Sequence, residues 1–154
     1  MAQSGLGRVL NVVFAASGVG IPLTKATAVT FVHSQGGTGT ATLTLTQTIS
    51  GASSANLNVG TDDFSTAAGP GRKSDYYVGP DTGGTWTLTA ATSANVYTLG
   101  GATNDTGVVT VRAEQLADGY NTVVGTASAG SLVAIIHDLT VARKPSNLSS
   151  NIVA

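Results

Sequence analysis

Cysteine is absent from this chain of 154 residues, and only 10% of its residues are charged. The lack of cysteine excludes disulfides and zinc sites built from thiolates, and it is compatible with assembly in a reducing cytoplasm. A typical globular domain has about 25% charged residues. Low charge beside a hydrophobic fraction of 42% excludes a charged disordered tail. The surface must therefore be solvated mainly by hydroxyl and backbone groups, which is common in proteins that pack against neighbours.

Basic stripes and long apolar runs are also lacking. The net charge is −1, and the two basic doublets are Arg72-Lys73 and Arg143-Lys144. Nucleic-acid-binding proteins usually carry a basic stripe, so we expect no nucleic-acid partner. No run approaches the ~20 apolar residues of a membrane helix, so we expect a soluble protein with no membrane partner. Arg8 and the apolar residues after it faintly imitate a signal peptide, but Asn11 interrupts the run, which argues against secretion.

The most informative segment that is present runs from Thr40 to Ile49. Threonine occupies every even position, and the odd positions hold Ala41, Leu43, Leu45 and Ile49 around one glutamine. Successive side chains of a β-strand point to opposite faces of the sheet. The pattern therefore predicts a strand with one buried apolar face and one outer face of hydroxyl groups.

Alternating segments of this kind recur along the chain, separated by turns rich in glycine, asparagine and aspartate. We expect an all-β fold, an antiparallel β-sandwich or β-barrel, because no helical pattern of 10–15 residues lies between the strands. The short segment 113–117 is the one helical candidate. The expected organisation is an N-terminal arm (1–24), a single β domain (25–144) and a C-terminal tail (145–154). The predicted strands cover residues 9–14, 26–33, 40–49, 56–59, 75–78, 85–89, 94–99, 107–113, 120–127 and 132–142.

Two of these strands invite specific predictions. Segment 85–89 places Trp86 and Leu88 inside and three threonines outside. The last strand, 132–142, has apolar residues on both faces, which predicts a strand that is central to the fold or buried at a subunit contact. Segment 60–71 is expected to be a long loop.

Candidate chemistry is sparse. His137-Asp138 is an adjacent pair of histidine and carboxylate, but neighbours on a strand point to opposite faces and cannot form a dyad. His137 shares its face with aliphatic residues and is interpreted as a core histidine. Asp62, Asp63 and Asp81 lie in predicted loops, yet the spacing of a calcium-binding loop is missing. We therefore expect no catalytic residues, no metal, no cofactor and no enzymatic activity.

Aromatic side chains gather at Tyr76, Tyr77 and Trp86. Interfaces favour tyrosine and tryptophan, and sugars also stack on such rings. The simplest interpretation puts Trp86 and one tyrosine of the pair in the core. Contact with a protein or with a sugar is the alternative.

The C-terminal third, through the stretches Asp118-Gly119-Tyr120-Asn121-Thr122-Val123 and 133–148, resembles small virion proteins of tailed bacteriophages. In particular, this third and the Thr/Gly/Ala-rich, cysteine-free composition look like the small capsid decoration (cement) proteins. The resemblance implies a non-enzymatic structural protein made in the bacterial host cytoplasm. Such a protein joins the capsid exterior of the virion, commonly as a homotrimer, and stabilises contacts of the major capsid protein.

Contact residues follow from the arms, the last strand and the tyrosine pair. The expected interface residues are Val9, Leu10, Val12, Phe14, Tyr76, Tyr77, Leu132, Ala134, Ile136, Arg143, Lys144 and Leu148. Two alternatives stay open: a phage tail-tube or head–tail connector subunit, and a secreted carbohydrate-binding or adhesin-like β module.

Overall fold

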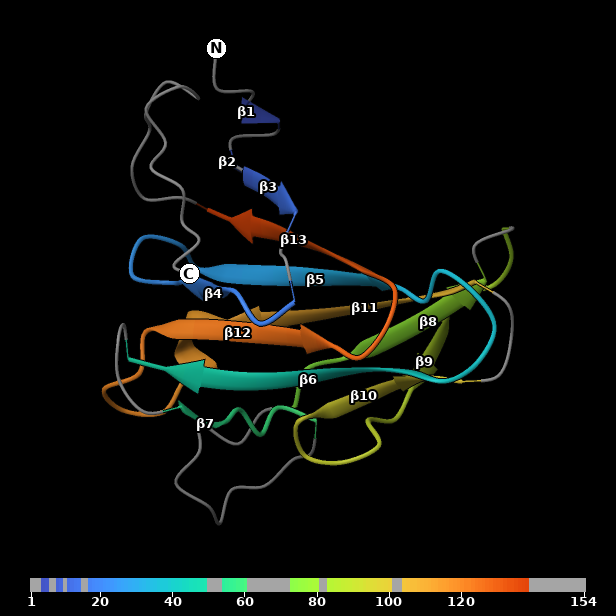
Figure 1. The fold of residues 1–154 in the computed structure, drawn as a ribbon. Helices are drawn as coiled ribbons and strands as arrows, with labels where there is room; N and C mark the ends of the chain where they lie inside the picture. Colours follow the sequence, from blue (N-terminus) through green and yellow to red (C-terminus); the bar gives the residue numbers. More distant parts are fainter. Residues whose placement is uncertain are drawn as a thin grey trace.

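A computed structural model describes residues 4–5, 8–9, 11–14, 17–49, 54–60, 73–80, 83–100 and 104–138. In these ranges the chain forms antiparallel β-strands and one turn of 3-10 helix, η1 (Ala113–Gln115). The expected all-β fold is confirmed as two sheets with open edges, not as a closed barrel (Figure 1). No helix in the described part of the chain is long and apolar enough to cross a membrane.

The larger sheet has six strands in the order β3–β13–β5–β11–β8–β9. Its two edge strands are far apart in the chain, because β3 comes from the N-terminal segment and β9 from the middle of the sequence. Their bounds, in that order, are β3 (Asn11–Phe14), β13 (Ser131–His137), β5 (Ala28–Ser34), β11 (Asp105–Arg112), β8 (Tyr76–Pro80) and β9 (Thr87–Thr89).

The second sheet has five strands. Its main order is β10 (Val96–Leu99), β6 (Ala41–Thr48), β12 (Thr122–Ala127) and β4 (Gly20–Pro22), and β7 (Ser54–Asn56) also pairs with β6. A separate small pair joins β1 (Ser4–Gly5) to β2 (Arg8–Val9). Within the segment expected as an N-terminal arm, β3 and β4 pair with β13 and β12, so each adds an edge strand to one sheet.

The core lies between the sheets and is filled by alternate residues of both. β5 contributes Val29 and Phe31, β6 contributes Leu43 and Leu45, and all four are buried. Tyr76 of β8 and Tyr97 of β10 meet across the interior with ring centroids 4.9 Å apart. Tyr76 is buried and its neighbour Tyr77 is exposed, which confirms the prediction that one of these two tyrosines faces the core.

The threonine strand forms as expected, with one exception. Ala41, Leu43 and Leu45 are buried, and Thr42, Thr44, Thr46 and Thr48 form the half-buried outer face. Ile49 was expected inside but lies beyond the end of the strand with 42% of its surface exposed. Gln47 takes the last inward position instead, where its amide donates to the Asn56 carbonyl at 3.1 Å and accepts from the Ala117 N–H at 2.9 Å.

The prediction that Trp86 and Leu88 lie inside is wrong. Their side chains are 49% and 59% exposed. The reason is the register with β8: Tyr76 pairs with Thr89 and Tyr77 with Leu88. Directly paired residues share a face of the sheet. Because Tyr76 points inward, its neighbour Tyr77 points outward, and Leu88, the partner of Tyr77, lies on the outer face with it.

The last strand ends at His137, earlier than expected, and the structure shows which of its two apolar faces is buried. Leu132, Ala134 and Ile136 point into the core, while Val133, Ile135 and His137 are half-buried on the outer face. The interpretation of His137 as a core histidine is therefore wrong; the buried histidine is His33. Asp138 leaves the strand with a left-handed φ of 50°, and residues 139–142 lie outside the described ranges.

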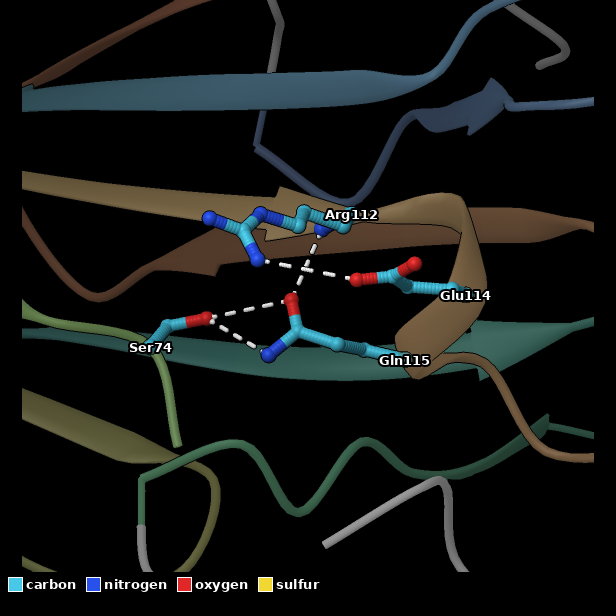
Figure 2. A network of polar contacts seen from close by, with 4 residues as sticks. All are labelled: Ser74, Arg112, Glu114 and Gln115. Carbon is cyan, nitrogen blue, oxygen red and sulfur yellow. Dashed lines mark hydrogen bonds and ion pairs between the residues drawn. The ribbon is translucent and has the colours of Figure 1, made fainter. Parts of the chain in front are cut away.

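The expected helical segment forms only the single turn η1. Its last residue, Gln115, is buried and hydrogen-bonds to neighbouring segments. The Gln115 side-chain oxygen accepts the Arg112 N–H at 2.8 Å, and its amide group lies within 3.3 Å of the Ser74 hydroxyl. Figure 2 shows this side chain between the end of β11 and the segment that enters β8. The nearby Arg112–Glu114 ion pair is long, at 3.6 Å, and exposed.

Replacing Gln115 by alanine is expected to lower the free energy of unfolding by about 1–3 kcal/mol, because the partly buried Arg112 N–H and Ser74 hydroxyl lose their hydrogen-bond partner. Urea unfolding measures this loss. Glu114→Ala is the matched control, since an exposed ion pair contributes only about 0–1 kcal/mol. Equal losses in the two variants would contradict the anchoring role of Gln115.

Candidate interaction surface

An apolar row crosses the outer face of the six-stranded sheet at a right angle to its strands. Each member pairs directly with the next: Val133 with Val32, Val32 with Val108, Val108 with Tyr77, and Tyr77 with Leu88. We call Val133, Val32, Val108, Tyr77 and Leu88 the apolar row. The three valines are half-buried, and exposure rises toward the edge, to 41% for Tyr77 and 59% for Leu88.

Trp86 extends this row along the edge strand. Its indole lies over Gly79 of β8, where an added Cβ would come within 2.7 Å of the ring. Glycine at this position therefore lets the ring lie close against the backbone. The result is an aromatic platform of Trp86 and Tyr77 beside Leu88, in which Trp86 is 49% and Tyr77 41% exposed.

The apolar row is flanked by hydroxyl groups. On one side lie Ser131, Ser34 and Thr106, which are consecutive partners on neighbouring strands. On the other side, Thr30 and Thr110 form a cross-strand pair with their hydroxyl oxygens 2.8 Å apart. These serine and threonine hydroxyl groups are uncharged, so they can hydrogen-bond to a partner of either charge.

The structure divides the predicted interface residues into three groups. Tyr77 is exposed on the apolar row, as an interface residue should be. Tyr76, Leu132, Ala134 and Ile136 are packed between the sheets, so in this chain they form core rather than surface, which corrects their assignment. For Val9, Val12 and Phe14 the structure describes the backbone only, and Leu10, Arg143, Lys144 and Leu148 lie outside the described residues.

A surface pocket lies on the same face, next to the Thr30–Thr110 flank of the apolar row. Thr27, Thr30, Thr110, His137 and Asp138 are among its lining residues. The His137 Nε2 atom is 2.7 Å from the Thr30 hydroxyl, and the Thr27 hydroxyl donates to the Asp138 carboxylate at 2.9 Å. The left-handed backbone at Asp138 brings this carboxylate to the pocket that His137 lines, so strand alternation does not separate the two residues as the sequence suggested.

The contacts in this pocket are those of a cross-strand hydrogen-bond network. Thr110, Thr30 and His137 form one chain of contacts across three neighbouring strands. His137 contacts Thr30 in this network, and Asp138 accepts a hydrogen bond from Thr27. Within the described ranges, no group of three or more histidine and acidic side chains could hold a metal ion. Asp62, Asp63 and Asp81, the calcium candidates, fall outside those ranges.

Sequence reasoning missed the apolar row, although a signal for it was present. Val32, Val108 and Val133 each occupy the outward position of an otherwise alternating strand. An apolar residue on the outward set of three separate strands indicates an exposed stripe only when the strand order is known.

Comparison with protein-family models, with curated proteins and with solved structures found no match to this chain.

Proposed function

We propose that this protein is a non-enzymatic virion structural protein that decorates the exterior of a phage capsid. It stabilises the shell through multivalent contacts with the major capsid protein. The observation that carries the proposal is the exposed apolar row with its aromatic platform on a rigid sheet face. Rigid aromatic side chains bind with little loss of conformational entropy, which suits an interface.

Repetition supplies the strength that one copy lacks. A surface row of this width contacts only a limited area of a partner, so a single copy binds weakly. On a capsid lattice, a self-associating decoration protein binds several sites at once, and the effective concentration raises the overall affinity by about 10²–10⁴-fold. The uncharged hydroxyl flanks support this role, since such binding depends little on salt.

Tyr77→Lys is expected to weaken capsid binding at least about tenfold, because a charge would be buried in an apolar contact. Co-sedimentation of the purified protein with undecorated capsids of its own phage measures this effect. Ile49→Lys is the matched control. Ile49 is 42% exposed, nearly the same fraction as the 41% of Tyr77, but it lies at the end of β6 in the other sheet. Wild-type binding by Tyr77→Lys, or equal loss in both variants, would reject the apolar row as the capsid contact.

The aromatic platform favours a second candidate, a carbohydrate-binding module. The indole of Trp86 and the ring of Tyr77 are both exposed, and aromatic rings pack well against apolar faces of ligands. A glycan array distinguishes the two functions. Sugar binding that is lost in Trp86→Ala, without capsid binding by the wild type, would support this second function over the first.

A further inference from the structure

Strand β9 is an edge strand of the larger sheet among the strands that the structure describes. It pairs with β8, and no other described strand covers its second side. Natural sheets usually protect such edges with lysine, proline or inward-pointing charges. Residues 83–100, which include β9 and the following edge strand β10, contain no Asp, Glu, Lys, Arg, His or Pro. The remaining protective device is shortness, because β9 has only three residues.

The side chains of this edge are complementary to their own copies. In an antiparallel pair of identical strands centred on Leu88, each Leu88 lies opposite the partner's Leu88 and on the same outer face. The same register places Trp86 opposite the partner's Ala90, a small exposed residue with room for the large ring beside it. Thr87 then meets the partner's Thr89 on the inner face, and threonine pairs of this kind are favourable across strands.

Charge also favours a second copy as the occupant. A two-fold contact brings the residues near the axis close to their own copies, so any charge there would face a like charge. None is present between residues 83 and 100. The apolar row, which rises in exposure to Leu88 and stops there, would continue without a break into the row of the second copy.

We propose that β9 pairs with β9 of a second copy around a two-fold axis at Leu88, joining two six-stranded sheets into one continuous sheet. A stable dimer usually buries about 800 Å² per partner. A three-residue ladder with Trp86 and Leu88 covers less than that, so the contact is weak in solution. The dissociation constant is expected near 10–100 μM, an order-of-magnitude value for a small interface. This contact does not depend on the proposed capsid function.

Analytical ultracentrifugation between about 5 and 500 μM, a range that brackets the expected dissociation constant, tests the contact. The wild type is expected to show a monomer–dimer equilibrium, and Leu88→Lys to raise the dissociation constant at least about tenfold, because two lysines would lie opposite each other. Tyr77→Lys, one strand further from the axis, is expected to dimerise like the wild type. Circular dichroism checks that each variant is folded.

The absence of cysteine permits a positional test. Directly opposite residues of antiparallel strands have Cα atoms about 4.5–5.5 Å apart, within the range of a disulfide. Mild oxidation is therefore expected to cross-link Leu88→Cys into a covalent dimer, while Ile49→Cys forms no cross-link. A wild type that is monomeric throughout the range, a trimer without a cross-link at residue 88, or unchanged association of Leu88→Lys would overturn the proposal. A wild type that forms this dimer but does not bind capsids would reject the proposed function alone.

Discussion

Alkaline pH is expected to unfold this protein, with stability falling by up to about 2.7 kcal/mol per pH unit above pH 10. Burial raises the pKa of both Tyr76 and Tyr97 well above the usual range, and the negative charge of Asp105 raises that of Tyr76 further. Above pH 10, the unfolded chain releases phenolic protons that the folded chain retains. The stabilising contribution is therefore complete below pH 10 and is lost as the pH rises toward the raised values.

Urea unfolding at pH 9, 10, 11 and 12 measures this slope, and absorbance near 295 nm reports phenolate formation. The double variant Tyr76→Phe/Tyr97→Phe is the control, because it cannot lose these protons. At neutral pH its stability should equal or slightly exceed that of the wild type, since both hydroxyl groups are buried without a hydrogen-bond partner among the described residues. A wild type and a double variant with the same alkaline slope would show that other groups cause the unfolding.

Gly130→Ala is expected to lower the free energy of unfolding by about 2–5 kcal/mol. Gly130 has a φ of 82°, a left-handed conformation that costs an alanine about 1–2 kcal/mol. Its added methyl would also overlap the Ser34 carbonyl oxygen and approach the Gln35 carbonyl group. Both are backbone atoms that cannot rotate aside, so the overlap adds about 1–3 kcal/mol.

Gly119→Ala separates the two causes. Gly119 has nearly the same φ, 86°, but an added Cβ would meet nothing within 4 Å. Its loss should stay near 1–2 kcal/mol, the conformational cost alone. Thermal unfolding provides a second measure, since 1 kcal/mol shifts the melting temperature by about 2–4 °C in a protein of this size. Equal losses in the two variants would mean that the β12–β13 turn of Gly130→Ala moves away from β5 and so avoids the overlap with the Ser34 carbonyl oxygen.

The environment of Gly130 also explains how the β12–β13 turn is held in place. His33, buried at the end of β5, donates its Nε2–H to the Ala129 carbonyl at 2.8 Å. The turn therefore rests on the end of β5, with Gly130 in close contact with the Ser34–Gly36 backbone. Neither contact is visible in sequence, because the partners are about a hundred residues apart.

Local alternation and turn residues predicted much of the fold. The segment around Leu43 and Leu45 is a strand with the expected buried face, and the glycine-containing segments at residues 36, 119 and 130 are turns with positive φ. These features depend on neighbours in the chain, so a single sequence determines them. The same reasoning failed at Trp86 and Leu88, where alternation defines two faces and does not say which one is covered.

The candidate surface could not be predicted for the same reason. The apolar row takes its residues from five strands, and only the strand order and register bring Val32, Val108 and Tyr77 into line. His137 was misplaced because its strand has apolar residues on both faces, and the covering sheet alone selects the face of Leu132 as the core. Gln47 was missed because its hydrogen-bond partners, Asn56 and Ala117, come from other segments of the chain.

The order of the residues was enough to predict an all-β chain with low charge, regular turns and a threonine face, because strand formation and turn geometry are local properties. The three-dimensional arrangement of the strands was needed to know which alternating face is buried, which of the described strands lies at a sheet edge, and where exposed apolar residues meet. Those outcomes depend on hydrogen-bond register between distant strands and on which face the second sheet covers, and both are properties of the assembled fold.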